Sequence, residues 1–315
     1  MKILVTGGAG FIGSALAYKL SDLGHEVTIV DMTCKSVDTS KVEAIGGDLS
    51  DDGQDNPLFG SKLALYQFDY IYHCAAQSSG YIGLIDSGKD IDWNVKATVN
   101  VFKYAKQTNV KKVIYTSSMS VYGNGTNLSE SSPIDPTSHY GISKYTGELY
   151  CKQYEKLGVD YSIFRLFNVY GFGQDMENLN QGMVSIYLAQ SLKGREILVK
   201  GSTDRFRDFV YIDDVVSALL LGMDDVTSNK TYNVCTGTKT TVKELLDIIV
   251  NAHDKGDDYF KINVVDQYEG DQHGASGLNV KLRQLGWEAN TELKDSNENS
   301  ILFANEFQRY NTTKS

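Results

Sequence analysis

A tyrosine and a lysine stand four residues apart at Tyr140 and Lys144, in a segment that reads as the start of a helix near His139. At this spacing two side chains lie on one face of a helix. A nearby ammonium favours the ionised form of a phenol, so the pair could make Tyr140 a general base. The chain contains 20 tyrosines, and a chance pairing is the alternative that this spacing alone leaves open.

The segment from Tyr115 to Ser120 is rich in hydroxyl side chains, with serines at Ser117, Ser118 and Ser120. It ends an apolar run that is expected to be a strand. Open parallel sheets bind their ligands beyond the carboxyl ends of the strands. These serines are therefore expected to face a ligand.

Three glycines, Gly7, Gly10 and Gly13, stand between the first candidate strand and the first candidate helix. With no Cβ in the way, the backbone N–H groups of such a loop and of the helix N-terminus can face a pyrophosphate. Phe11 and Ile12 open the helix and are assigned to the same site. Glycine triplets also occur in ordinary turns, and the strand-loop-helix context is what favours a dinucleotide here.

An acidic residue, Asp31, follows Gly13 by 18 positions, at the end of the second candidate strand. A carboxylate there can accept hydrogen bonds from both ribose hydroxyls of adenosine and repels a 2′-phosphate, which favours NAD over NADP. The alternative is a solvated aspartate that only ends a strand. Asp48 and Leu49, after the third candidate strand, are interpreted as an adenine contact, although a surface turn explains Asp48 nearly as well.

Short β-rich runs alternate with helix-period segments through the first half of the chain, the pattern of a parallel sheet covered by helices on both faces. The candidate strands are Lys2 to Thr6, Glu26 to Asp31, Glu43 to Gly46, Tyr70 to Cys74, Lys112 to Thr116 and Ser162 to Leu166. The candidate helices are Phe11 to Leu23, Asp92 to Thr108 and His139 to Leu157. The expected fold class is α/β, a Rossmann-type doubly wound parallel sheet.

The alternation loosens after Gly171, which indicates a second, smaller α/β lobe. We expect residues 1–171 to form an NAD-binding Rossmann domain and residues 172–315 to form mainly a substrate-binding lobe. Helical segments are expected at Gly182 to Leu192 and Val242 to Ala252. A segment at about 207–228 joins a strand-like stretch to an apolar run, and it is expected to return to the first lobe.

The composition limits the class of partner. The 315 residues carry a formal net charge of -10 and a sequence pI near 5.0, and an acidic surface repels nucleic acid and anionic membranes. No run of 18 apolar residues occurs, so no membrane span or signal peptide is expected. The four cysteines stand singly, which favours free thiols, no metal site and a cytoplasmic location.

Together these segments resemble the extended short-chain dehydrogenase/reductases, and within them the NAD-dependent nucleotide-sugar epimerases and dehydratases. The resemblance runs from Met1 to about Trp287. Besides the glycine loop, the matching segments are His73-Cys74-Ala75-Ala76-Gln77, Asn94-Val95, Ser118-Met119-Ser120-Val121-Tyr122-Gly123, Tyr140 to Lys144, Arg165 to Gly171 and Arg207 to Asp214.

The resemblance implies a role for each matching position. Tyr140 is similar to the catalytic base, Lys144 to its charge partner and ribose anchor, and Ser118 to a hydroxyl donor. Further implied cofactor contacts are Ala75, Ala76, Asn94, Ser117 and Phe167. The implied contacts to a nucleotide-diphosphate sugar are Gln77, Ser118, Met119, Ser120, Tyr140, Asn168, Arg207 and Asp271. The donor fork of Arg207 matches phosphate oxygens, although a lone arginine more often pairs with a neighbouring carboxylate such as Asp208.

The residue two places after Ser118 distinguishes branches of this family. The dehydratases and decarboxylases carry an acid there, because loss of water or carbon dioxide needs acid–base help, whereas this chain has Ser120. The segment is more similar to that of UDP-sugar 4-epimerases of the UDP-glucose/UDP-galactose or UDP-N-acetylhexosamine type. The resemblance then implies that Tyr140 takes the proton of the sugar 4-hydroxyl while hydride passes to NAD, and that the resulting ketone is reduced on its other face.

Three alternatives stay open: a nucleotide-sugar 4-dehydrogenase, a 4,6-dehydratase, and a catalytically silent NAD-binding redox sensor. One departure concerns the nucleotide, because Tyr268-Glu269-Gly270-Asp271 offers a tyrosine where many relatives have a diphosphate-binding arginine. The base need not be uracil. The resemblance also implies a homodimer built from the helices at Asp92 to Thr108 and His139 to Leu157.

Overall fold

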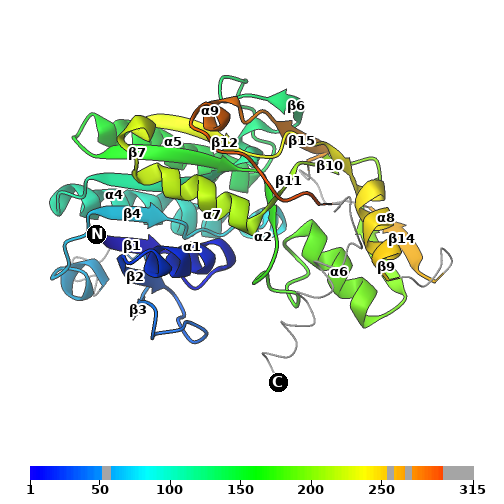
Figure 1. The fold of residues 1–315 in the computed structure, drawn as a ribbon, viewed down its shortest axis with the longest axis horizontal. Coiled ribbons are helices and arrows are strands. Elements are labelled where there is room, and N and C mark those ends of the chain that lie inside the picture. Colours follow the sequence, from blue (N-terminus) through cyan, green and yellow to red (C-terminus); the bar gives the residue numbers. More distant parts are fainter. Residues whose placement is uncertain (52–57, 254–258, 267–271, 294–315) are drawn as a thin grey trace.

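The computed structural model describes residues 1–51, 58–253, 259–266 and 272–293 (Figure 1). Its largest element is a seven-stranded parallel sheet in the order β12-β7-β5-β4-β1-β2-β3. The strands are β1 (Lys2–Thr6), β2 (Glu26–Asp31), β3 (Glu43–Gly46), β4 (Tyr70–His73), β5 (Lys112–Ser118), β7 (Asp160–Leu166) and β12 (Lys230–Val234). The strand order reverses direction between β1 and β4, as in Rossmann-type sheets, so the predicted fold class is confirmed.

Apolar side chains fill both faces of the central strands. In β1, Ile3 and Val5 belong to one core and Leu4 to the other, and all three are fully buried. A parallel sheet covered on both sides needs such continuous apolar runs. This is why the apolar pattern predicted β1 and β2 with the bounds that the structure has. The edge strand β3 also has its predicted bounds, although its side chains are only partly buried.

Helices cover both faces of this sheet (Figure 1). The core around Ile3 and Val5 takes in α1 (Phe11–Asp22), α7 (Ile212–Leu220) and α9 (Val280–Gln284), and the opposite core takes in α4 (Ala97–Gln107) and α5 (His139–Glu155). The Ser138 hydroxyl caps α5 by accepting a hydrogen bond from the backbone N–H of Gly141 at 3.1 Å. This cap fixes the first turn of α5, where Tyr140 stands.

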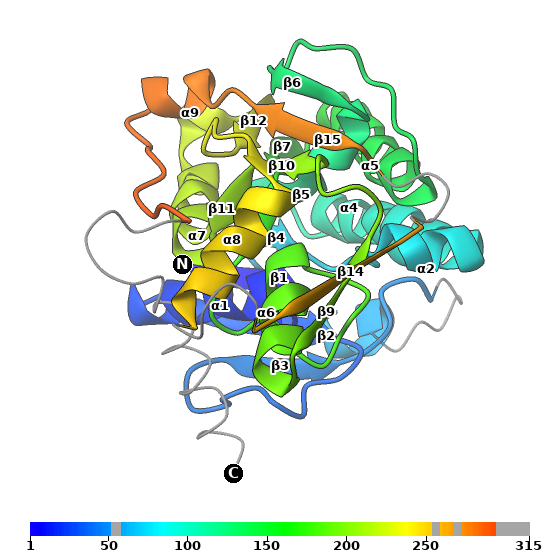
Figure 2. The ribbon, with the colours of Figure 1, turned by 90° about the vertical axis from the view of Figure 1, so that its right-hand side faces the viewer.

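A smaller lobe lies at one end of the sheet, on the right in Figure 1, and faces the viewer in Figure 2. One part of it packs α6 (Met183–Lys193) and α8 (Val242–Ala252) on the strand pair β9 (Glu196–Lys200) and β14 (Lys261–Val265). The other part is a four-stranded sheet of β13 (Thr240–Thr241), β10 (Phe206–Arg207), β15 (Gly274–Gly277) and β6 (Gly125–Leu128). A further two-stranded parallel pair is formed by β8 (Asn168–Tyr170) and β11 (Phe209–Tyr211).

Short helical elements connect these parts. They are α2 (Gly80–Ile85), α3 (Ser87–Asp90), π-type turns at Leu58–Lys62 and Ile91–Lys96, and 3-10 turns at Met119–Tyr122, Leu221–Met223 and Asp225–Thr227. The helix predicted from Asp92 to Thr108 is therefore two successive elements, the second π-type turn and α4. In the part of the chain that the structure describes, no helix is long and apolar enough to span a membrane.

The return of the chain to the first lobe is longer than the predicted segment at about 207–228. β12 forms the edge of the main sheet, and the buried Leu282 and Trp287 pack in the core around α1 and α7. The indole N–H of Trp287 donates to the carbonyl oxygen of Asp214 at 3.1 Å. Conversely, one segment before Gly171 belongs to the smaller lobe, because β6 pairs with β15 there. The boundary at Gly171 stays a prediction.

Candidate active site

A cavity of about 820 Å³ lies at the carboxyl ends of the central strands and is walled by both lobes. Most residues predicted to bind cofactor or substrate line it. They are Gly7, Gly10, Phe11, Ile12, Gly13, Asp31, Asp48, Leu49, Ala75, Ala76, Gln77, Ser117, Ser118, Met119, Ser120, Tyr140, Lys144, Phe167, Asn168 and Arg207. Asn94 is not among the lining residues, and Asp271 and Tyr268 lie outside the described residues.

Two positions of the glycine loop leave no room for a side chain. Gly7 has φ +68°, and a Cβ on it would lie 2.6 Å from the backbone nitrogen of Ala75. A Cβ on Gly13 would lie 2.1 Å from the carbonyl oxygen of Gly7. Because Gly10 has no side chain to cap α1, the first backbone N–H groups of that helix remain available to a phosphate.

Two aspartates at the strand ends differ in how they are held. Asp31 Oδ2 accepts a hydrogen bond from the backbone N–H of Ala9 at 3.1 Å, which sets the carboxylate beside the glycine loop, as the ribose assignment requires. Asp48 Oδ1 accepts from both the backbone N–H and the hydroxyl of Ser50 at 2.8 Å. The turn interpretation of Asp48 therefore accounts for these contacts, although the residue also lines the cavity.

Asn94 braces the cavity wall from behind. It is 1% exposed. Its Oδ1 accepts from the backbone N–H of Gln77 at 2.7 Å, and its Nδ2 lies 2.9 Å from the carbonyl oxygen of Gln77 and 2.8 Å from Ser143 Oγ. Asn94 thus supports the Gln77 loop, and the cofactor contact that the resemblance implied for it stays a prediction.

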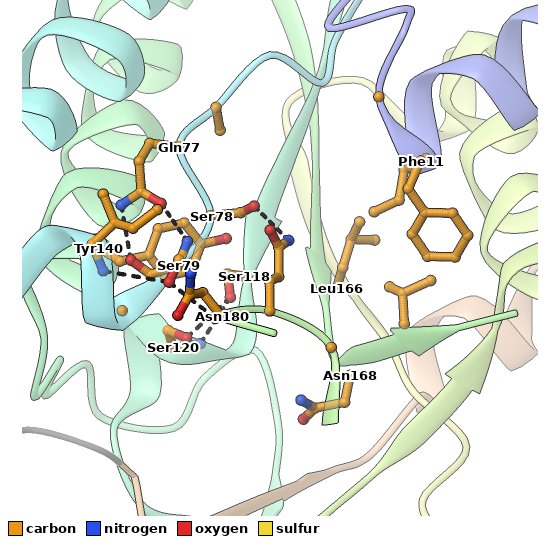
Figure 3. A pocket seen from close by; sticks show the side chains of 18 of the residues that line it. Phe11, Gln77, Ser78, Ser79, Ser118, Ser120, Tyr140, Leu166, Asn168 and Asn180 are labelled. Atoms are coloured by element: carbon orange, nitrogen blue, oxygen red, sulfur yellow. Dashed lines mark hydrogen bonds between the residues drawn. The ribbon is translucent and has the colours of Figure 1, made fainter. Parts of the chain in front are cut away.

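Ser118 and Tyr140 meet at one side of the cavity, and Figure 3 shows them near Ser120 with Asn168 further along. Ser118 ends β5, and its hydroxyl donates to Ser120 Oγ at 3.2 Å. It is also close enough to Tyr140 to lower the pKa of that phenol. Lys144 is 2% exposed, and its Nζ lies 4.6 Å from the centroid of the Tyr115 ring. A phenol and a hydroxyl in contact at a cavity wall can bind one alcohol or carbonyl oxygen and exchange its proton.

Burial dominates the ionisation of this group. It raises the pKa of Tyr140 to about 12, with the Ser118 hydroxyl opposing the rise and the charge of Asp90 adding to it. Burial also lowers the pKa of Lys144 to about 8. Lys144 is not among the groups that shift the pKa of Tyr140 in the structure, so the lowering expected from this lysine is not seen. A further positive charge in the cavity is needed to make the phenol a base near neutral pH.

A buried ion pair holds α5 to the sheet directly behind these residues, and the sequence did not predict it. Glu148 Oε1 accepts from Arg165 Nε at 2.8 Å, and Glu148 Oε2 lies 2.6 Å from an Arg165 terminal nitrogen. Their side chains are 0% and 4% exposed. The hydroxyl of Ser117 donates to Glu148 Oε1 at 2.6 Å, so this hydroxyl supports the helix although Ser117 also lines the cavity.

Arg207 and Asn168 lie toward the smaller lobe. Arg207 is 5% exposed, and its guanidinium donates to the carbonyl oxygens of Phe206, His273 and Gln272 at 2.8, 3.2 and 3.0 Å. Asn168 Oδ1 is buried, and no partner for it exists among the described residues. Since a buried amide oxygen without a donor is costly, Asn168 is suited to a ligand's hydroxyl or N–H group.

Two contacts join the lobes across the cavity, and neither gave a sequence signal. The hydroxyl of Ser79 donates to the carbonyl oxygen of Asn180 at 3.1 Å, and Gln181 Nε2 donates to Ser78 Oγ at 2.6 Å. Figure 3 shows Ser78, Ser79 and Asn180 grouped on the same side of the cavity as Tyr140. These residues enlarge the predicted substrate wall.

A Rossmann-type sheet with an obligate glycine loop, an acid at the end of β2, and a serine, tyrosine and lysine at the same cavity defines the extended short-chain dehydrogenase/reductases. The donor set suits a dinucleotide, because it offers helix N–H groups to a pyrophosphate and a carboxylate to a ribose. The fold and the residues of this chain are thus those of a nicotinamide-dependent enzyme class.

Comparison with known proteins identifies the family. The model of the NAD dependent epimerase/dehydratase family matches residues 3–235, and the chain belongs to this family. It is 32% identical over 322 residues to a UDP-glucose 4-epimerase of Mycolicibacterium smegmatis, covering 96% of this chain and 98% of the relative. A UDP-N-acetyl-alpha-D-glucosaminuronate decarboxylase of Bacillus cytotoxicus is 30% identical over 257 residues, covering 78% of each.

A solved structure gives the same answer for the fold. The UDP-glucose 4-epimerase of Thermotoga maritima, crystallised with UDP-glucose, superimposes with a TM-score of 0.88 at 29% identity and covers 98% of this chain and 99% of its own. The family predicted from the sequence is confirmed, and NAD is the cofactor that the family description names.

Proposed function

We propose that this protein is a nucleotide-sugar 4-epimerase of the UDP-glucose/UDP-galactose or UDP-N-acetylhexosamine type that works with bound NAD. The observation that carries the proposal is the meeting of Ser118, Tyr140 and Lys144 at one cavity that has Ser120 where a dehydratase has an acid. Among the described lining residues, the only carboxylates are those of Asp31 and Asp48, which follow β2 and β3. No carboxylate that lines the described cavity therefore stands beside Tyr140; the acid near it, Asp90, is buried behind the lining residues.

The residues that would hold NAD all belong to the lobe built on the main sheet. The glycine loop and the N-terminus of α1 would take the pyrophosphate, Asp31 the adenosine ribose, and Tyr140 with Lys144 the nicotinamide ribose. When bound, NAD supplies a hydride acceptor that becomes the donor later in the same cycle.

The chain's own residues manage the proton. Tyr140 takes the proton of the sugar 4-hydroxyl and returns it at the end of the cycle, while the Ser118 hydroxyl donates to the same oxygen. The buried ammonium of Lys144 favours the phenolate form. Because the ring must present both faces in turn, the contacts of the Asn168 amide N–H₂ group and of the Arg207 guanidinium to the diphosphate should be firmer than the contacts to the sugar.

Dehydration and decarboxylation need an additional acid–base group at the neighbouring carbon, and Ser120 is a poor one. A 4-dehydrogenase would use the same three residues as an epimerase. It differs in its product, because NADH accumulates with a keto sugar.

The test is a panel of UDP-, GDP-, CDP- and dTDP-sugars, with sugar stereochemistry followed by proton NMR and NADH by absorbance. Interconversion of two 4-epimers without net NADH is the expected result. Stoichiometric NADH would make the protein a dehydrogenase, and a silent panel would favour an NAD-binding sensor. Tyr140→Phe is the inactive control, and Tyr150→Phe on the same helix is the matched active one.

The proposal includes a homodimer in the cytoplasm. Helix α5 exposes Ile142 at 51% and Leu149 at 47%, and apolar exposure of this kind favours a helical interface with a second copy. All four cysteines are free, as suits a reducing compartment. Sedimentation of the purified protein tests the dimer, and a monomer at micromolar concentration would refute it.

A further inference from the structure

Asp90, the last residue of α3, is a buried acid next to the cavity wall. It is 1% exposed. Its Oδ1 accepts from the side-chain amides of Gln77 and Asn94, both at 3.0 Å, while its Oδ2 has no hydrogen-bond partner within the described chain. A buried carboxylate with one oxygen unsatisfied costs stability. Its presence therefore points to a role other than folding.

A glycine makes room for the unpaired oxygen. A Cβ on Gly83 in α2 would lie only 2.2 Å from Asp90 Oδ2. Any larger residue at this position would push the carboxylate away from the Gln77 and Asn94 amides. Helix α2 can approach Asp90 this closely because it carries glycine there.

The two amides lead from Asp90 to the catalytic helix. Asn94 Nδ2 lies 2.8 Å from Ser143 Oγ, and the Ser143 hydroxyl donates to the carbonyl oxygen of Tyr140 at 2.8 Å. Gln77 lines the cavity itself, and its backbone is bound on both sides by Asn94. A single buried carboxylate thus joins the Gln77 loop to the first turn of α5.

We propose that Asp90 is a positioning residue for the epimerase reaction proposed above: it holds Gln77 and Asn94 against the catalytic helix and places a carboxylate beside Tyr140. The inference rests on the proposed function. The charged and titratable groups around Asp90 are Asp86 at the start of α3, and His139, Tyr140 and Lys144 of α5.

The effect of the Asp90 charge on the pKa of Tyr140 has a sign that can be tested. Burial raises the pKa of Asp90 to about 6, so the group is ionised at neutral pH. Its negative charge adds to the raised pKa of Tyr140. Removing the charge should lower the pKa of Tyr140, and activity that depends on the phenolate should then persist to lower pH.

The experiment compares the NAD-loaded wild-type protein with Asp90→Asn, Asp90→Ala and the control Asp92→Asn, in which an exposed aspartate two positions away loses the same charge. The constants kcat and KM are measured against pH on the nucleotide sugar that the wild type converts. Asp90→Asn keeps an acceptor for both amides and removes only the charge. The acid limb of its kcat–pH profile should therefore move to lower pH by about half a unit to one unit. Asp90→Ala should lose about tenfold in kcat with less change in KM, and Asp92→Asn should match the wild type.

An Asp90→Asn acid limb that coincides with that of Asp92→Asn would overturn the charge effect. A wild-type kcat in Asp90→Ala would overturn the positioning role. If Asp90→Ala does not fold, Asp90→Asn carries the test, because it retains the shape of the side chain.

A second readout is independent of turnover. Phenolate absorbance in the ultraviolet is titrated in the NAD-loaded protein, with and without Asp90→Asn, and each trace is referred to a Tyr140→Phe counterpart. A lower midpoint for Tyr140 in Asp90→Asn supports the inference, and an unchanged midpoint overturns it. A wild type that converts no nucleotide sugar would refute the proposed function, while this titration would still decide the case of Asp90.

Discussion

Replacing Glu148 by Gln should lower the free energy of unfolding by about 3–5 kcal/mol, the cost of stranding one member of a buried ion pair. The carboxylate accepts two hydrogen bonds from Arg165, at 2.8 and 2.6 Å, and one from Ser117 at 2.6 Å. A glutamine presents one oxygen and an N–H₂ group that cannot accept. Arg165 would keep its contact to the Tyr122 hydroxyl at 2.8 Å but lose its counter-charge at 4% exposure.

The assay is equilibrium urea unfolding, followed by tryptophan fluorescence and by circular dichroism. The matched control is Glu177→Gln, which breaks the pair of Glu177 with Lys193, whose side chains are 70% and 51% exposed. That loss should stay below about 1 kcal/mol, because exposed pairs contribute little. The double variant Glu148→Gln with Arg165→Met removes both charges and should recover much of the lost stability.

Two results would refute this reasoning. If Glu148→Gln lowers the free energy of unfolding no more than Glu177→Gln does, the Arg165 guanidinium must be stabilised without the Glu148 charge. A double variant less stable than Glu148→Gln would mean that the contacts of Arg165 to Tyr122 matter more than its stranded charge.

Three further predictions concern the cavity. Tyr140→Phe should lower kcat by about 10²- to 10⁴-fold, the usual contribution of a positioned base, with NAD affinity nearly unchanged in calorimetry; substantial remaining activity would place the base elsewhere. Asp31→Ala should weaken NAD by about tenfold to a hundredfold through two lost charged hydrogen bonds and NADP far less, whereas equal NAD affinity would refute the ribose assignment. Gly13→Ala should weaken NAD binding by a similar factor, because its Cβ would lie 2.1 Å from the Gly7 carbonyl oxygen and overpacking of this kind costs about 1–3 kcal/mol. A wild-type Kd for NAD would show that the loop relaxes freely.

The sequence was sufficient for the parts of the fold that depend on local pattern. The apolar run Ile3, Leu4 and Val5 predicted β1, because a strand buried on both faces of a sheet carries apolar side chains at successive positions. The glycine loop could be recognised from the spacing of its glycines between a strand and a helix. The steric reason for Gly13 is local, because its Cβ would meet the Gly7 carbonyl oxygen, whereas a Cβ on Gly7 would meet the distant Ala75. The proposed tyrosine and lysine were predicted from their spacing on one helix, and the proposed serine from the resemblance of its segment to the family.

Contacts between distant segments left no such pattern. Strand β6 (Gly125–Leu128) has the sequence Gly-Thr-Asn-Leu and forms only because β15 pairs with it. Glu148 and Arg165 look like ordinary surface charges until α5 packs on β7. The raised pKa of Tyr140 likewise depends on how deeply the folded protein buries the phenol, whereas spacing along the helix predicted only the opposing charge of Lys144.

This division separates the type of reaction from the choice of substrate. Ser118, Tyr140 and Lys144 stand on β5 and α5, which the local sequence predicts, so the chemistry proposed for them rests on motifs. The wall beside them depends on contacts such as Ser78 with Gln181 at 2.6 Å, between residues of two lobes that are 103 positions apart. Since a polar contact at a substrate wall discriminates between sugars by the hydroxyls that it can bind, changing Ser78 or Gln181 to alanine should alter KM between sugars and leave the pH dependence set by Tyr140 unchanged.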